Sequence, residues 1–403
     1  MVGSGGREAC LALVLARTAE VVVTPGNPGI PGSVATPPEE IDADLFVVGP
    51  EAPLVDGLAD RLRAAGRRVF GPGADGAQLE GSKSWMKELV TAAGVPTARY
   101  GHFDAVEPAV AFLRSLPGPY VVKTDGLAAG KGVFVTDDLA AAEADVLEKL
   151  SGASFGDAGR SVVVEEGMTG PEVSVFAICD GTTAVALPPA QDFKRVGDDD
   201  TGPNTGGMGA YSPLDWLPEG FTDDVLARFV EPTLAELRRR GIDYRGVLYA
   251  GLMVTPEGPK LVEYNVRFGD PDSQVVLLRM TSDLATLLGE AADGRLVSEP
   301  TYDTTAAVLV VAAAEGYPAS PRTGDVIEGL VAAQQEEGVT VLCAGVAADA
   351  DGRLVTAGGR VIEVVGQGPD VATARDRAHR SLGHLSWPGR HHRTDIARKV
   401  STP

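Results

Sequence analysis

The sequence has few positive charges for its length. Lys and Arg number 35 against 56 Asp and Glu, which gives a net charge of −21 over 403 residues. A chain without a basic field does not attract phosphate backbones or anionic lipid surfaces, so we expect no nucleic-acid and no membrane partner. Small phosphorylated ligands are not excluded, because they need only a local group of N–H donors and a few cations.

Cysteines and long apolar runs are also scarce. Cys10, Cys179 and Cys343 lie far apart without a C-x-x-C spacing, which indicates buried thiols in a reducing compartment. The longest apolar stretch, "TTAAVLVVAAAEG", is too short to cross a membrane, and no signal peptide is recognisable. We therefore expect a cytoplasmic protein.

Histidine is missing from the middle of the chain. The five histidines are His102, His379, His384, His391 and His392, so none falls between 103 and 378. This gap excludes a Ser-His hydrolase centre and a His-ligated zinc from a central catalytic domain.

What is present indicates a mixed α/β and α+β fold in three parts. Residues 1–82 alternate apolar runs with helical patterns, which predicts a parallel sheet covered by helices. Residues 83–300 read as a compact α+β unit with Ser82 as a helix N-cap, and "QDFKRVGDDDTGPNTGGMGAYSP" within it as a long loop. Residues 301–396 are richer in strands and form a smaller α+β domain, and 397–403 are a tail.

Two stretches carry chemistry by their spacing. In "VVKTDGLAAGKGVFV", Lys123 ends a strand, and glycines on both sides of Lys131 would let backbone N–H groups approach a phosphate. An ordinary glycine-rich hairpin has the same composition, so this stretch alone leaves both readings open. In "LVEYNVRFGDPDSQ", Glu263, Asn265 and Arg267 alternate along a strand and share one face. A carboxylate and an amide oxygen suit Mg²⁺, and an arginine suits a carboxylate or phosphate.

Two further stretches give weaker indications of a binding role. In the loop, Lys194 and Arg195 precede the acidic run Asp198–Asp200 and then glycines, which favours a substrate-binding lid over a solvated loop. In "VVVEEGMTGPEVS", the strand edge at 165–168 could read an adenine ring, and Glu172 could bind ribose hydroxyls.

Together these motifs resemble the glycinamide ribonucleotide synthetase family, ATP-grasp ligases of purine biosynthesis. The resemblance runs from "GSGGRE" through "VVGPEAPLVDGLAD", "QLEGSK", "VVKTDGLAAGKGV", "GDDDTGPNTGGMGAYSP" and "RFGDPD" to "TAGGRVIEVVG" and "RTDIARK". It implies a Rossmann-like N-terminal domain, an ATP-grasp unit of two subdomains with a lid at about 125–187, and a small β-rich C-terminal domain. The implied reaction phosphorylates glycine with ATP and Mg²⁺ or Mn²⁺, and the amine of 5-phosphoribosylamine then attacks the acyl phosphate. Lysines and a metal suffice for this chemistry, so the histidine gap is consistent with it. The chain would act as a monomer or homodimer on small molecules.

The resemblance also assigns residues by motif match. ATP contacts are expected from Lys83, Lys123, Gly130, Lys131, Gly132, Glu165, Glu166, Met168 and Glu172. Metal ligands are expected to be Glu263 and Asn265, and the catalytic group to be Asp192, Lys194, Arg195 and Arg267. Substrate contacts are expected from Gly5, Gly6, Arg7, Pro50, Glu51, Asn204, Thr205, Gly206, Gly207, Met208 and Asp270.

Some positions depart from the family pattern. Ala9 and Phe193 stand where the family has histidine, and Asp272 stands where it has glutamate. The sequence therefore does not determine which amine and which amino acid the chain uses. It is either the housekeeping enzyme or a paralogue with a changed substrate. A catalytically inactive nucleotide-binding relative is a minor third alternative. Only Met1 and Val2 precede the glycine turn, so we expect a first strand that lacks most of its length, and we favour a start assigned too late over a sheet built without that strand.

Overall fold

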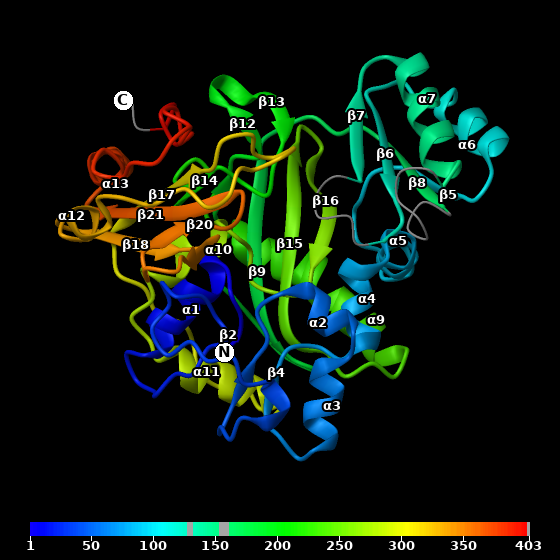
Figure 1. Ribbon diagram of the computed structural model, residues 1–403. Helices are drawn as coiled ribbons and strands as arrows, with labels where there is room; N and C mark the ends of the chain where they lie inside the picture. The colour runs from blue at the N-terminus through cyan, green and yellow to red at the C-terminus, as the bar shows by residue number, and fades with distance from the viewer. Residues whose placement is uncertain (127–131, 153–160, 401–403) are drawn as a thin grey trace.

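The computed structural model describes residues 1–126, 132–152 and 161–400. It has the mixed α/β and α+β architecture expected from the sequence. In Figure 1 the N-terminal elements lie below a central sheet, a smaller sheet with two helices stands at the upper right, and the C-terminal sheet lies at the left. Within the described residues, no helix is long and apolar enough to cross a membrane.

The N-terminal elements form a small parallel sheet. Its elements are β1 (Val2–Gly3), α1 (Gly6–Leu15), β2 (Thr24–Pro25), β3 (Phe46–Val47), α2 (Glu51–Val55), α3 (Leu58–Ala64) and β4 (Val69–Phe70). β1 pairs in parallel with β2 and, through a single bridge to Val48, joins the β3–β4 pair. The first strand is thus only two residues long, and it lies inside this sheet. One of the helical patterns expected in residues 1–82 is interrupted at Gly57, between α2 and α3, where a φ of 76° suits glycine.

Two helices lead from this sheet into the central unit. They are α4 (Ala74–Gly81) and α5 (Lys83–Ala92). The Ser82 hydroxyl accepts the backbone N–H of Trp85, so Ser82 caps α5 as the sequence predicts.

The central unit contains two antiparallel sheets. The smaller one has the order β5-β8-β6-β7 and carries α6 (Val106–Leu113) and α7 (Leu139–Leu150); its strands are β5 (Tyr100–Phe103), β6 (Tyr120–Thr124), β7 (Val133–Thr136) and β8 (Val162–Glu166). The larger one has the order β10-β9-β15-β16, with β9 (Glu172–Asp180), β10 (Ala184–Ala186), β15 (Arg245–Thr255) and β16 (Gly258–Asn265). β9 and β10 thus pair with the larger sheet although they fall within 125–187, and a moving lid over that range stays a prediction.

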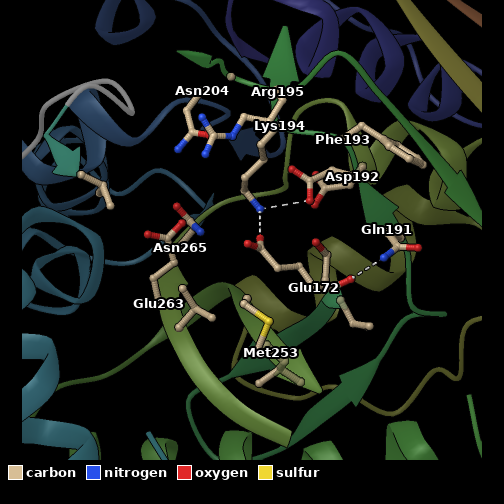
Figure 2. Close-up of a pocket in the computed structure, with 18 of the residues that line it drawn as sticks. Glu172, Gln191, Asp192, Phe193, Lys194, Arg195, Asn204, Met253, Glu263 and Asn265 are labelled. Carbon is tan, nitrogen blue, oxygen red and sulfur yellow. Dashed lines mark hydrogen bonds and ion pairs between the residues drawn. The ribbon is translucent and has the colours of Figure 1, made fainter. Parts of the chain in front are cut away.

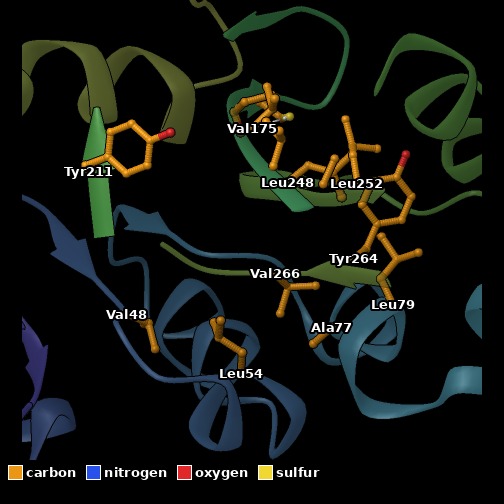
Figure 3. Packing of buried hydrophobic residues seen from close by; sticks show 14 of the residues in the cluster. Val48, Leu54, Ala77, Leu79, Val175, Tyr211, Leu248, Leu252, Tyr264 and Val266 are labelled. Carbon is orange, nitrogen blue, oxygen red and sulfur yellow. Dashed lines mark hydrogen bonds between the residues drawn. The ribbon is translucent and has the colours of Figure 1, made fainter. Parts of the chain in front are cut away.

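Helices lie against the larger sheet. They are α8 (Phe221–Val225), a π-helical turn at Leu226–Val230, α9 (Glu231–Arg239) and α11 (Leu284–Ala292), whereas α10 (Asp272–Leu277) contacts β14 (Gly209–Ser212) and β17 (Ala306–Ala313). One buried apolar cluster joins this sheet to the N-terminal elements. Figure 3 shows Val48 and Leu54 from the N-terminal part facing Val266, with Ala77 of α4 beside them. The N-terminal sheet and the central sheet therefore share a core.

The C-terminal sheet takes up a segment that the sequence assigned to a loop. Its order is β11-β14-β17-β21-β18, built from β11 (Gln191–Asp192), β14 (Gly209–Ser212), β17 (Ala306–Ala313), β18 (Val339–Cys343) and β21 (Arg360–Gly368). The prediction of a structureless loop over 191–213 is wrong, because β14 is buried throughout and pairs antiparallel with β17. In the segment that connects β11 to β14, β12 (Arg195–Gly197) and β13 (Thr201–Asn204) form a hairpin around a short 3-10 turn at Asp198–Asp200.

The remaining C-terminal elements are the helices α12 (Leu330–Gln334) and α13 (Val371–Leu382), which pack on this sheet, and a separate hairpin of β19 (Val346–Ala348) and β20 (Leu354–Thr356). A 3-10 turn at Pro38–Glu40 lies in the N-terminal part.

Candidate functional site

A cavity of about 1100 Å³ brings most of the predicted site residues together. Its walls come from β6 and β8 of the smaller sheet, from β9, β15 and β16 of the larger one, and from the 191–206 segment. The predicted residues among its lining are Arg7, Glu51, Lys83, Lys123, Gly132, Glu165, Glu166, Met168, Glu172, Asp192, Lys194, Arg195, Asn204, Thr205, Gly206, Glu263, Asn265, Arg267 and Asp270.

The other predicted residues lie elsewhere. Gly5 and Gly6 line a second cavity of about 340 Å³, which Asp270 also borders. Pro50 precedes the lining residue Glu51, and Gly207 and Met208 follow the lining residue Gly206, with the Met208 side chain buried in the core. Gly130 and Lys131 lie outside the described residues.

A buried charge network holds the first lysine of the site. Lys123 at the end of β6 lies 2.8 Å from Glu165 of β8, and Lys87 of α5 lies 2.9 Å from the other oxygen of the same carboxylate. Burial raises the pKa of Glu165, but the two ammonium groups outweigh it and hold that pKa below its usual range. The Glu165 carboxylate thus orients Lys123 from the neighbouring strand, and the adenosine contact expected at Glu165 stays a prediction.

Strand β16 presents the residues expected to bind a metal. Glu263 and Asn265 are two residues apart and both line the cavity, as Figure 2 shows. Arg267 follows, and it donates to Asn265 Oδ1 at 3.1 Å and to Glu80 at 2.8 Å. In the described part of the chain, no three His, Cys, Asp or Glu side chains gather closely enough to hold a metal ion by themselves. One carboxylate and one amide oxygen fit Mg²⁺ only if a bound nucleotide supplies further oxygens.

A second lysine is held between two acids on the opposite wall. Lys194 contacts Glu172 of β9, and its Nζ lies 3.1 Å from Asp192 Oδ1; Figure 2 shows both interactions. Burial is the main cause that raises the pKa of Asp192 to about 6, although Lys194 opposes it, and Asp272 adds to the increase. Burial lowers the pKa of Lys194, but the two acids raise it well above its usual value. This lysine stays charged while Asp192 can change its charge near neutral pH.

Comparison with known proteins identifies the family. Models of the N domain, the ATP-grasp (A) domain and the C domain of phosphoribosylglycinamide synthetase match residues 1–80, 81–273 and 307–399, respectively. The chain belongs to the phosphoribosylglycinamide synthetase family.

Its relatives in this family are similar over almost their whole length. A phosphoribosylamine–glycine ligase of Caulobacter vibrioides is 48% identical, with 98% of this chain and 96% of the relative covered. One of Streptomyces coelicolor is 47% identical, with 100% and 99% covered. The crystal structure of the Thermotoga maritima ligase has 34% identity and a TM-score of 0.86, with 98% of this chain and 99% of that chain covered. A biotin carboxylase domain of Hydrogenobacter thermophilus, at 16% identity and a TM-score of 0.72, shares the fold.

The structure adds a connection that sequence reasoning missed in this family member. The acidic run that was assigned to a substrate lid binds the C-terminal segment 391–398. Asp198 accepts the Thr394 backbone N–H at 2.8 Å, and Asp200 accepts Arg393 at 2.7 Å. Arg393 is fully buried and also donates to Asp395 through two nitrogens, at 2.7 and 2.6 Å.

This connection reaches the cavity. The Arg393 guanidinium also donates to the Arg195 carbonyl at 3.1 Å and lies 5.1 Å from the centre of the Phe193 ring. Since Phe193 and Arg195 flank Lys194, the C-terminal segment fixes the backbone that carries this lysine. Nothing local in the sequence marks the contact, because the partners are almost 200 positions apart; only their opposite charges could have suggested it.

Proposed function

We propose that this chain is an ATP-dependent ligase that joins glycine to 5-phosphoribosylamine. ATP phosphorylates the glycine carboxylate, and the amine displaces phosphate from the resulting acyl phosphate to give glycinamide ribonucleotide, ADP and phosphate. Full-length similarity at 46–48% identity to relatives named phosphoribosylamine–glycine ligase supports this reading over a paralogue with a changed substrate.

The observation that carries the proposal is the pairing of the two cavities. In the larger one, Lys83 and Lys123 stand beside Glu263 and Asn265, which fits nucleotide phosphates and Mg²⁺. In the smaller one, the glycine turn before α1 faces Arg360, a cation beside backbone N–H groups, which fits a sugar phosphate. Because both cavities share Asp270 and Arg360, an amine in one lies close to an activated carboxylate in the other.

The residues of the chain supply positioning and charge. Lysines and the metal, when bound, neutralise the charge that develops as phosphate is transferred, and phosphate is a good leaving group in the second step. Glu263 and Asn265 would hold the metal, and Arg267, which Glu80 fixes at 2.8 Å, faces the same cavity. No histidine base is needed in this scheme.

Two of the three departures from the family pattern border the cavity. Ala9 is buried in an apolar cluster on α1, so it has no direct route to a substrate. Phe193 and Asp272 line the larger cavity, and Oδ2 of Asp272 finds no hydrogen-bond donor among the described residues. These two positions are where a changed acid or amine would be recognised.

One assay tests the proposal. The protein is supplied with ATP, Mg²⁺, glycine and phosphoribosylamine generated in place, and glycinamide ribonucleotide is detected by mass together with ADP. We expect stoichiometric product and ADP, each dependent on both substrates. ADP release with another amine or acid, but none with this pair, would support the paralogue, and no ADP with any pair would refute a ligase.

A further inference from the structure

Behind the junction of the two cavities lies a buried acid that the proposed reaction does not use. Glu363 of β21 is 0% exposed, and its Oε2 accepts Gln274 Nε2 at 2.9 Å. The same amide nitrogen donates to Asp270 Oδ1 at 3.0 Å. A Cβ placed on Gly6 would lie 2.1 Å from Glu363 Oε2, so the glycine turn packs directly on this carboxyl group. Residues from all three matched domains therefore meet here.

The two carboxyl groups of this cluster differ in their partners. Asp270 pairs with Arg360 at 3.0 Å, and Arg7 adds a second positive charge nearby. Glu363 has Gln274 as its donor, and its other oxygen, Oε1, finds no donor among the described residues. Arg360 also lies near Glu363 and favours its charged form, and the buried Cys10 thiol of α1 faces it as well.

Two buried carboxylates in contact do not both ionise readily, so one keeps a proton. Burial and the adjacent Asp270 raise the pKa of Glu363 well above its usual value. For Asp270, burial acts in the same upward sense, but Arg360 and Arg7 outweigh it and hold its pKa below the usual range. The shared Gln274 amide holds the two carboxyl groups close together, so a proton on Glu363 lets that group act as a donor to Asp270.

We propose that Glu363 is a positioning residue that acts as a neutral acid: it donates a hydrogen bond to Asp270 and holds the charged carboxylate of Asp270 at the junction of the two cavities, where the amine substrate binds. Asp270 and Arg360 border both cavities, whereas Glu363 lies behind them. The inference rests on the proposed function for the identity of the amine, but the protonation of Glu363 does not.

Two variants of similar size separate the hydrogen bond from packing. Glu363→Gln keeps a donor for Asp270 and an acceptor for Gln274, and Glu363→Met keeps the volume alone. We expect Glu363→Met to raise the KM for phosphoribosylamine about tenfold, the effect of one lost buried hydrogen bond, with the KM for ATP within twofold of the wild type. Glu363→Gln should restore the wild-type KM for the amine at pH 7. An unchanged amine KM in Glu363→Met, or equal losses in both variants, overturns the proposal.

Infrared spectroscopy tests whether Glu363 is protonated, and this measurement does not require an active enzyme. At pH 8, the wild-type protein should show the carbonyl stretch of a protonated, buried carboxyl group, and a wild-type minus Glu363→Gln difference spectrum should contain it. A difference spectrum that shows an ionised carboxylate instead refutes the neutral acid. If the wild type made no glycinamide ribonucleotide but this band were present, the proposed function would fail and the proton assignment would stand.

Discussion

Removing Arg393 should release the C-terminal segment from the hairpin that carries Lys194. The guanidinium is fully buried and donates to Asp395, Asp200 and the Arg195 carbonyl. Arg393→Ala leaves the buried Asp395 carboxylate without its cation. Breaking a buried ion pair from one side costs about 3–5 kcal/mol, since the remaining charge stays desolvated.

That energy converts into a measurable opening of the segment. At about 1.4 kcal/mol for each factor of ten, the local opening equilibrium should rise between about a hundredfold and a few thousandfold. The backbone N–H groups of Asp199 and Thr394, which donate to Asp395 and Asp198 at 2.8 Å each, report it by hydrogen exchange. Burial raises the pKa of Asp395, but hydrogen bonds from Arg393 and the Asp199 N–H outweigh it and lower that pKa to about 2. Its stabilisation is therefore complete above pH 4 and is lost only as pH falls through about 2, so exchange at pH 7 measures the whole effect.

A matched control removes an arginine from an exposed pair. Arg228 and Asp224 are four residues apart at 2.8 Å, with both side chains more than 40% exposed. Arg228→Ala should change stability by about 0.3–0.5 kcal/mol and leave exchange at Asp199 and Thr394 unaltered. Arg393→Lys keeps the positive charge but lacks the planar guanidinium group, so its hydrogen-exchange rates at Asp199 and Thr394 should lie between those of the two alanine variants. If Arg393→Ala left both amides as protected as the control does, the anchoring role would be wrong.

Three further outcomes are expected from the cavity itself. Because Asp192 has a pKa of about 6 and must be charged to hold Lys194, kcat/KM should fall as pH decreases through about 6. Asp192→Asn should remove this acidic decrease from the pH–rate profile. A decrease that persists in the variant contradicts this role. Lys87→Met should raise the KM for ATP about tenfold, because Glu165 then binds Lys123 alone and draws it from the phosphates, and unchanged ATP affinity by calorimetry would refute it. Glu263→Gln should abolish ADP formation while the circular dichroism spectrum is retained; full activity would remove Glu263 from the metal site.

Elements with local patterns could be predicted from the sequence. Glu263 and Asn265 lie on one face of β16 as their spacing requires, and Ser82 caps α5. The strand β14 could not be predicted, because its four residues give no alternating pattern and their pairing with β17 spans about a hundred positions. Local propensity is a weak guide where such long-range pairing decides.

The same limit applies to side-chain partners in the site. The sequence identified Lys123 and Glu165 but assigned them to different ligand contacts, since nothing local places β6 beside β8. Lys87 was missed, although it lies one helical turn after Lys83 and its position on the same face of α5 could have suggested a shared environment. Spacing therefore indicates which side chains share a face, and tertiary pairing decides what each of them contacts.

The charge arrangement of the cavity explains how a chain with a net charge of −21 can receive a polyanion. Several cations at the site are paired with carboxylates, as in Lys123 with Glu165 and Arg360 with Asp270, whereas Lys83 and Arg195 donate to the carbonyls of Gly126 and Gly202. Such pairing fixes long side chains in place before binding, which lowers the entropy lost when a phosphate arrives, but it also cancels much of their attraction. We expect the missing attraction to come from a divalent ion that enters with the nucleotide. Affinity for ATP should therefore depend strongly on Mg²⁺, more than it would in a site whose lysines stand unpaired.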